Sequence, residues 1–136
     1  MDELKHEMQQ REISNVTFHG EISDIPSFLE TLDIYFQPSL YEGLCITVIE
    51  AMAAGLPVVG ADVGGISQNV TNGENGFLFD PYDVEGYTDA IEELATDAEQ
   101  REQLGSNGRK IVERSFTQER LVEEFKNAVM KAKQQQ

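Results

Sequence analysis

The chain has little cysteine, no tryptophan and few basic residues. Its 136 residues include one cysteine, and its ten lysines and arginines stand against 25 acidic residues, for a formal net charge of −15. The single cysteine, Cys45, excludes an internal disulfide and a metal site with several cysteine ligands. The acidic excess disfavours binding to nucleic acid or to an anionic membrane surface.

Long apolar runs are also missing from the sequence. No stretch of about 18 apolar residues is present, so no segment is expected to span a membrane. The opening MDELKHEMQQRE is charged throughout and has no apolar core of the kind that a secretory signal needs. We therefore expect a cytoplasmic protein, with peripheral membrane association only through parts outside these residues.

The basic residues are absent from one long stretch of the chain. Neither lysine nor arginine occurs between Glu12 and Gln100, and all ten lie before or after it. Any anionic ligand bound by this stretch must find its positive charge elsewhere, for example at the N-terminus of a helix.

What is present is a regular alternation of short apolar segments and segments with helical periodicity. Strands are expected at NVTFHG (15–20), DIYFQPS (33–39), LPVVGA (56–61) and within 72–81. Helices are expected at 2–11, from a cap at Asp24 or Ser23 to Leu32, at 44–54, 64–70 and 83–97. Such alternation is typical of βαβ units, and it predicts an α/β fold with a doubly wound, Rossmann-like parallel sheet.

The length predicts one domain with three parts. These are a lead-in helix (1–14), a βα core (15–81) and C-terminal helices (82–136). Thr96 and Glu99 have the spacing of a capping box for a helix after 97. Thr117 can cap a last helix that carries Leu121, Val122, Phe125 and Val129.

The segment EGLCITVIE (42–50) places a carboxylate at each end of an apolar run. If a helix begins near Leu44, Glu42 lies at its mouth and Glu50 roughly two turns inside. Parallel sheets bind ligands at the carboxyl ends of their strands, which is where this segment begins. A free helix N-terminus suits phosphate, and a carboxylate can accept both hydrogen bonds of a cis-diol.

The stretch PSLYEGLCITVIEAMAAGLPVVGADVGGISQNVTNGENGFLFDP resembles the donor-binding, C-terminal domain of retaining GT-B glycosyltransferases of the group 1 type, also called family 4. Their hallmark is PS-x-x-EG, two glutamates separated by seven residues (E-x7-E), EAMA-x-G-x-PV and a GG turn. NVTFHG with the following Glu21 and Ile22, and ERSFTQERLVEEF, extend the resemblance from about Asn15 to Val129. The residues that match the hallmark are Pro38, Ser39, Glu42, Gly43, Glu50, Ala51, Met52, Ala53, Gly55, Pro57, Val58, Gly64 and Gly65.

The resemblance implies a site for a nucleotide sugar. Glu42 would contact hydroxyls of the donor sugar and stabilise positive charge at the reacting carbon, so it is the expected catalytic group. Glu50 would bind the ribose hydroxyls, and the backbone around Ile22 would hold the base. The backbone N–H groups of Gly43, Leu44, Cys45 and Ile46 would face the diphosphate.

Two features depart from the commonest family pattern. The family most often has a second glycine where this chain has Cys45. The second feature is the absence of phosphate-binding cations. In metal-free members an arginine and a lysine serve the diphosphate, and both come from an opening segment that precedes the part matched here. No D-x-D metal motif occurs in the chain. We therefore expect no metal or cofactor, an incomplete GT-B domain truncated at its N-terminus, and no turnover by the chain alone.

Several properties stay open at this point. The donor would be a UDP-, GDP- or ADP-sugar, and a missing N-terminal half or a partner chain would supply the acceptor site. A phosphoacceptor receiver domain is disfavoured because the basic-free stretch offers no lysine among its strands. The rival interpretation is a non-catalytic Rossmann-like module that binds a nucleotide or another protein.

Overall fold

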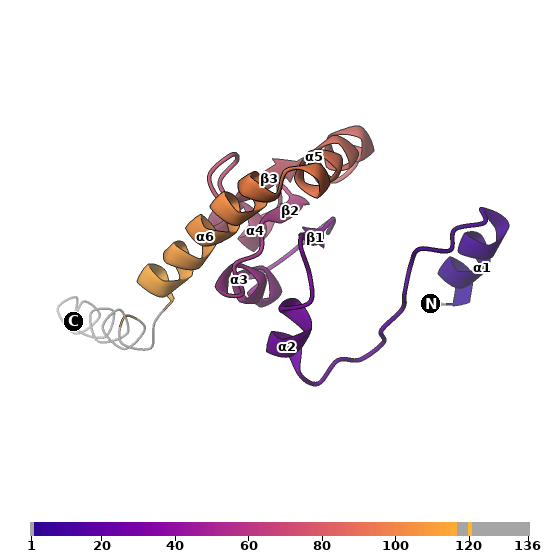
Figure 1. Cartoon of the computed structure of the whole chain (residues 1–136), viewed down its shortest axis with the longest axis horizontal. Helices are drawn as coiled ribbons and strands as arrows, with labels where there is room; N and C mark the ends of the chain where they lie inside the picture. Colours follow the sequence, from indigo (N-terminus) through magenta and orange to yellow (C-terminus); the bar gives the residue numbers. More distant parts are fainter. Residues whose placement is uncertain (1, 117–119, 121–136) are drawn as a thin grey trace, which may run out of the picture.

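A computed structural model of the chain describes residues 2–116 and Arg120. Its centre is a parallel sheet of three strands in the order β1-β2-β3, with helices on both faces (Figure 1). The elements are α1 (Asp2–Gln10), α2 (Ile25–Leu29), β1 (Tyr35–Gln37), α3 (Ile46–Ala53), β2 (Val58–Ala61), α4 (Gly64–Asn69), β3 (Gly76–Phe79), α5 (Val84–Thr96) and α6 (Ala98–Ser115).

The middle strand, β2, organises the core. All four of its residues are buried, as expected for a parallel strand covered on both faces. Because successive side chains point to opposite faces, Val58 belongs to the cluster under α3 and α4, whereas Val59 belongs to the cluster under α5. The register pairs Tyr35 with Val58 on one side and Val58 with Gly76 on the other.

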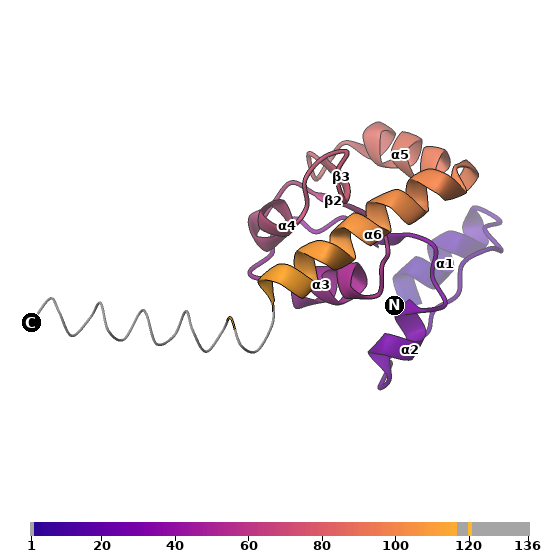
Figure 2. The ribbon, with the colours of Figure 1, turned by 60° about the vertical axis from the view of Figure 1, so that its left-hand side comes forward.

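Helix α6 joins the two sides of the domain. It packs against α3 and α5 and runs across the molecule in Figure 2. Leu104, near its start, joins the cluster under α5, and Ile111 and Val112, near its end, pack against the cluster under α3. Helix α3, which follows the loop that carries Glu42, therefore packs directly on α6.

Most of the predicted elements are confirmed, with ends that differ by a few residues. Asp24 is the N-cap of α2. Its carboxylate accepts from the Ser27 hydroxyl at 2.8 Å and from the Ser27 backbone N–H at 3.2 Å, and these two hydrogen bonds lower the Asp24 pKa. That helix ends at Leu29 rather than Leu32. The last predicted helix, with its cap at Thr117, lies outside the described residues.

The predicted strand at 15–20 is wrong. These residues lie in an extended connection that leads from α1 to α2 and runs well away from β1 (Figure 1). A strand needs the backbone of a neighbour for its hydrogen bonds, and β1 is too far away to provide it. Phe18 instead faces α1, where the Lys5 ammonium lies 5.7 Å from the centre of its ring.

The predicted capping box at Thr96 and Glu99 is also wrong. The N-cap of α6 is Asp97, whose carboxylate accepts from the Gln100 backbone N–H at 2.9 Å. The Thr96 hydroxyl donates instead to the carbonyls of Glu92 and Glu93, inside α5. Aspartate is a stronger N-cap than threonine, so the cap falls one residue later than the spacing suggested.

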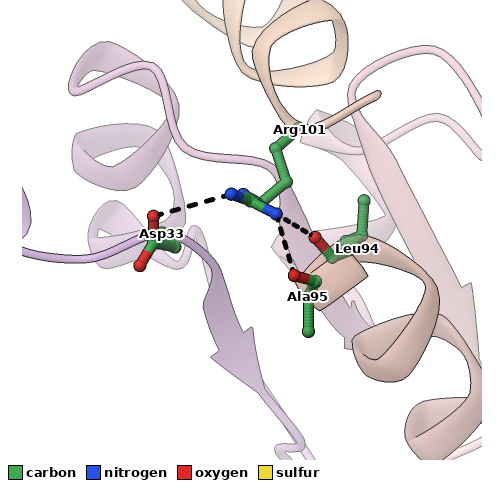
Figure 3. Close-up of polar contacts among 4 residues, drawn as sticks. All are labelled: Asp33, Leu94, Ala95 and Arg101. Atoms are coloured by element: carbon green, nitrogen blue, oxygen red, sulfur yellow. Dashed lines mark hydrogen bonds and ion pairs between the residues drawn. The ribbon is translucent and has the colours of Figure 1, made fainter. Parts of the chain in front are cut away.

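The first cation after the basic-free stretch, Arg101, joins three elements (Figure 3). Its guanidinium donates to the carbonyls of Leu94 and Ala95, at the C-terminal turn of α5, and lies 4.0 Å from the carboxylate of Asp33. These carbonyls have no partner within the helix, and the positive charge complements the negative end of the helix dipole. Arg101 thus has a structural role.

Two glycines in α6 allow a matched test of this packing. A Cβ on Gly105 would collide with the backbone carbonyl oxygen of Gly55, whereas a Cβ on Gly108 would make ordinary contact with Met52 at 3.4 Å. Gly105→Ala should therefore lower the free energy of unfolding by about 2 kcal/mol or more. Gly108→Ala should leave it unchanged or raise it by up to about 1 kcal/mol, because alanine favours a helix. Urea unfolding followed by circular dichroism measures both, and equal effects would contradict the contact between α6 and Gly55.

Candidate functional site

The candidate site lies on the loop between β1 and α3, at the carboxyl end of β1. Helix α3 begins after Cys45, which has a left-handed backbone (φ 53°) and makes no side-chain capping hydrogen bond. A left-handed backbone is costly for any residue except glycine, so the loop is strained at Cys45. The loop therefore turns sharply into α3, whose first N–H groups have no partner within the helix.

The start of α4 holds this loop in place. Gly64 and Gly65 lie so close to it that a Cβ on Gly64 would overlap the carbonyl oxygen of Glu42, and one on Gly65 would overlap that of Gly43. Asn69, at the end of α4, donates from its amide to the carbonyls of Gly65 at 2.7 Å and of Leu44 at 3.4 Å. The glycine pair thus serves close backbone packing, which is the reason for glycine at both positions.

Glu42 is half-buried and held by hydrogen bonds. Its Oε1 accepts from the hydroxyl of Ser39 at 2.7 Å and from the amide of Gln37 at 3.1 Å. The Gln37 amide also donates to the Ser39 Oγ at 2.7 Å, and the Tyr35 hydroxyl donates to Gln37 Oε1 at 2.8 Å. The carboxylate therefore has a defined orientation before any ligand arrives.

Tyr35 lies amid the charged and polar groups of the site. Burial raises the pKa of its hydroxyl above the ordinary value, and a hydrogen bond with the Thr47 side chain acts in the opposite direction. Cys45, Glu42 and Glu50 add smaller electrostatic effects that raise the same pKa. Both glutamates of the motif thus lie near one tyrosine, at the junction of β1 and α3.

Glu50 is exposed and lies more than one turn inside α3. It lines a cleft of about 410 Å³ between α2, α3 and α6. A cation, Arg109 of α6, lines the same cleft and also lies 3.6 Å from Glu113. The other lining residues are Ile25, Pro26, Leu29, Glu30, Ala53 and Ala54.

The remaining predicted residues are placed as follows. Gly43 and Leu44 are exposed on the loop, and a Cβ on Gly43 would find no atom within 4 Å. Ile46, the first residue of α3, is exposed, whereas Cys45 is buried in the core cluster under that helix. Ile22 is half-buried in the connection before α2 and does not line the cleft beside Glu50.

Sequence reasoning missed Tyr35, Gln37 and Arg109. A signal existed for Gln37, because it is a polar side chain at the end of the apolar strand segment DIYFQ, directly before the motif. Arg109 offered none, since only the packing of α6 on α3 brings it to the cleft beside Glu50.

Two features are absent from the part of the chain that the structure describes. In residues 2–116 and Arg120, no group of three or more His, Cys, Asp or Glu residues could hold a metal ion. Nor does any helix among these residues combine the length and the hydropathy that crossing a bilayer requires.

The close packing of α4 on the loop can be tested at Gly65. Gly65→Ala introduces a Cβ that must displace the backbone of Gly43 and Leu44, so the free energy of unfolding should fall by about 2–3 kcal/mol. Ser67→Ala, at an exposed position of the same helix, is the control and should change it by less than about 0.5 kcal/mol. If both variants unfold at the wild-type urea concentration, α4 and the loop are not in contact as described.

Comparison with known proteins identifies this arrangement. The sequence profile of the family described as "Glycosyl transferases group 1" matches residues 1–111. The capsular polysaccharide biosynthesis glycosyltransferase CapM of Staphylococcus aureus is 35% identical over 113 residues, which cover 83% of this chain and 30% of CapM.

Solved structures show the same fold. Sucrose-phosphate synthase from Thermosynechococcus elongatus matches 99% of this chain and 35% of its own with a TM-score of 0.88 and 28% identity. Anabaena HepE in complex with UDP matches 96% of this chain and 36% of its own with a TM-score of 0.90 and 26% identity. The structure of HepE in complex with UDP-glucose covers 81% of this chain and 31% of HepE, with a TM-score of 0.76 and 30% identity.

The predicted fold class, an α/β fold with a parallel sheet of the GT-B glycosyltransferase type, is thereby confirmed. The chain spans about a third of the length of the relatives that it matches. A profile match over most of the chain, a relative at 35% identity and structural neighbours of one kind agree with one another. This chain belongs to the Glycosyl transferases group 1 family.

Proposed function

We propose that this chain binds a nucleotide sugar as the donor-binding part of a retaining hexosyltransferase. The observation that carries the proposal is the geometry around the start of α3. Glu42, whose carboxylate is held by hydrogen bonds, lies before the helix. Gly43 follows it, with no protein atom within 4 Å of where its Cβ would be. A second carboxylate, Glu50, lies inside α3 and lines the cleft between α2, α3 and α6. A sugar, a diphosphate and a nucleoside follow one another in the same order.

The diphosphate would lie at the N-terminus of α3. The first N–H groups of a helix have no partner within it, and they carry the positive end of the dipole. Gly43 allows the phosphate oxygens to approach the backbone closely, and the N–H groups of Leu44, Cys45 and Ile46 would continue the contact. Glu50 would then accept hydrogen bonds from the two ribose hydroxyls, with the base near α2 and the backbone around Ile22.

Glu42 would serve the transferred sugar. When the bond from the anomeric carbon to the diphosphate oxygen breaks, the electron pair leaves with the diphosphate and positive charge develops on the sugar ring. A fixed carboxylate stabilises that charge electrostatically. With retention, the acceptor hydroxyl forms its new bond on the face from which the diphosphate departs, and a diphosphate oxygen takes the acceptor's proton.

UDP-sugars are the preferred candidates among the three nucleotides, because the structural neighbour HepE was solved with UDP and with UDP-glucose. The chain spans about a third of its relatives' length, so we assign the acceptor site to sequence beyond these 136 residues or to a second chain. A cytoplasmic reaction fits a nucleotide-activated donor, and no metal or cofactor is invoked.

The charge balance favours a chain that does not turn over alone. One helix N-terminus supplies about half a unit of positive charge against roughly two negative charges on a diphosphate. The segment from Glu12 to Gln100 contains no basic residue, and Arg101 is engaged with α5. Arg109, in the cleft beside Glu50, is paired with Glu113. We therefore propose that cations from elsewhere complete the site. The same shortage favours the second candidate, a module that binds a nucleotide without transferring a sugar.

The assignment of Glu50 can be tested by calorimetric titration of the chain with UDP. Glu50→Ala should weaken UDP binding by about tenfold, because the ribose hydroxyls lose a charged acceptor. Glu92→Ala, at an exposed position of α5, removes the same charge far from the site and is the control. Equal affinities for wild type and Glu50→Ala would remove Glu50 from the nucleotide site, and no UDP binding by the wild type would contradict the proposed function.

Gly43 offers a test in which stability and binding separate. A Cβ at this position meets no protein atom within 4 Å, so Gly43→Ala should unfold at the wild-type denaturant concentration. The same Cβ would stand where the phosphates approach, so UDP affinity should fall by about tenfold or more. Unchanged affinity for UDP in this variant would place the diphosphate elsewhere.

A further inference from the structure

The hydrogen bonds around Glu42 form a chain that begins at Tyr35. The Tyr35 hydroxyl meets Gln37 Oε1 at 2.8 Å, and Gln37 Nε2 meets both Ser39 Oγ, at 2.7 Å, and Glu42 Oε1, at 3.1 Å. Ser39 Oγ also meets Glu42 Oε1, at 2.7 Å. All four side chains are half-buried, and Tyr35, Gln37 and Ser39 follow one another at every second position where β1 runs into the loop.

The chemistry of the last member sets the direction of the whole chain. An ionised carboxylate can only accept, so the single proton of the Ser39 hydroxyl goes to Glu42. Ser39 Oγ must then accept from Gln37, which requires the NH₂ end of the Gln37 amide to face Ser39 and Glu42. The carbonyl end faces Tyr35 and accepts the proton of its hydroxyl.

The two donors that reach Glu42 share one oxygen. Ser39 and Gln37 both donate to Oε1, and within residues 2–116 and Arg120 no hydrogen bond ends on Oε2. The acceptor capacity of Oε2 is therefore available to a ligand. A carboxylate with both oxygens free would rotate, and holding it for a ligand would cost side-chain entropy at the moment of binding.

We infer that Tyr35, Gln37 and Ser39 are positioning residues for the donor sugar: they hold Glu42 by Oε1 so that Oε2 accepts hydrogen bonds from the sugar's hydroxyls. This inference rests on the proposed function, and it adds residues on β1 that act only through Glu42. The chain of donors distinguishes a nucleotide sugar from the free nucleotide, since UDP has no group for Oε2 to bind.

The test compares the affinities of the full chain for UDP-glucose and for UDP. Gln37→Met keeps the length of the side chain and removes its polar end, and Ser39→Ala removes the hydroxyl. Both variants should lower the affinity for UDP-glucose by about tenfold, as should Glu42→Gln, and leave the affinity for UDP within about twofold. Ser39→Thr keeps a hydroxyl and should keep most of the preference for UDP-glucose over UDP. Gln68→Met, on the exposed side of α4, is the matched control.

The outcomes separate the inference from the proposed function. If Glu42→Gln abolishes the preference for UDP-glucose while Gln37→Met and Ser39→Ala keep it, Glu42 binds the sugar without the chain of donors, and the inference is wrong. Equal losses for UDP and UDP-glucose in Gln37→Met would mean that Gln37 supports only the packing of the loop. A wild-type chain that binds neither ligand overturns the proposed function itself.

A second measurement needs no ligand. In proton–nitrogen spectra of the free chain, the side-chain amide protons of Gln37 should exchange with water more slowly than those of the exposed Gln68. Glu42→Gln and Ser39→Ala should each shift the Gln37 amide resonances and speed their exchange. Exchange of Gln37 at the rate of Gln68 in the wild type would overturn the inference, because the amide would then not be engaged as described.

Discussion

The close backbone contact between α4 and the loop before α3 is the constraint on which the rest of the site depends. Gly64 and Gly65 leave no room for a Cβ between themselves and the carbonyls of Glu42 and Gly43. With the loop held there, Cys45 adopts its left-handed backbone and α3 begins at Ile46. The first N–H groups of α3 have no partner within the helix. Two loops at the carboxyl edge of the sheet thus become one surface, because a bulkier pair at 64–65 would force them apart.

The basic-free stretch limits how this surface could bind an anionic ligand. No side-chain cation lies between Glu12 and Gln100, so the positive charge for a bound anion would have to come from backbone N–H groups, whose orientation is set by the fold. Arg101 binds the carbonyls of the C-terminal turn of α5 (Figure 3). Arg109 lines the cleft together with residues of α2. A diphosphate bound as proposed would be oriented by these N–H groups and neutralised only in part, so the proposed function calls for cations from elsewhere.

Much of the fold could be predicted from local pattern because the elements near the sheet's centre are governed by burial. The apolar run of β2 and the cap of α2 at Asp24 are local signals, and the structure confirms both. The failure at 15–20 has the opposite cause: NVTFHG has the composition of a strand, but strand formation requires a partner's backbone that the pattern of one segment does not reveal. At Asp97, two adjacent residues could both cap α6, and the stronger acceptor prevailed.

The site shows the same division between local and non-local information. The motif identified Glu42, Gly43 and Glu50, and the structure places all three along the start of α3, but their roles with a ligand stay predictions. The motif does not say which oxygen of Glu42 is free, since that depends on Gln37 and Tyr35, which lie on β1 before it. A carboxylate at the end of a chain of donors has one oxygen occupied and one available, whereas a carboxylate on an unsupported loop has neither in a fixed place. The precision of the proposed sugar contact therefore comes from the strand, through side chains that would never touch the sugar.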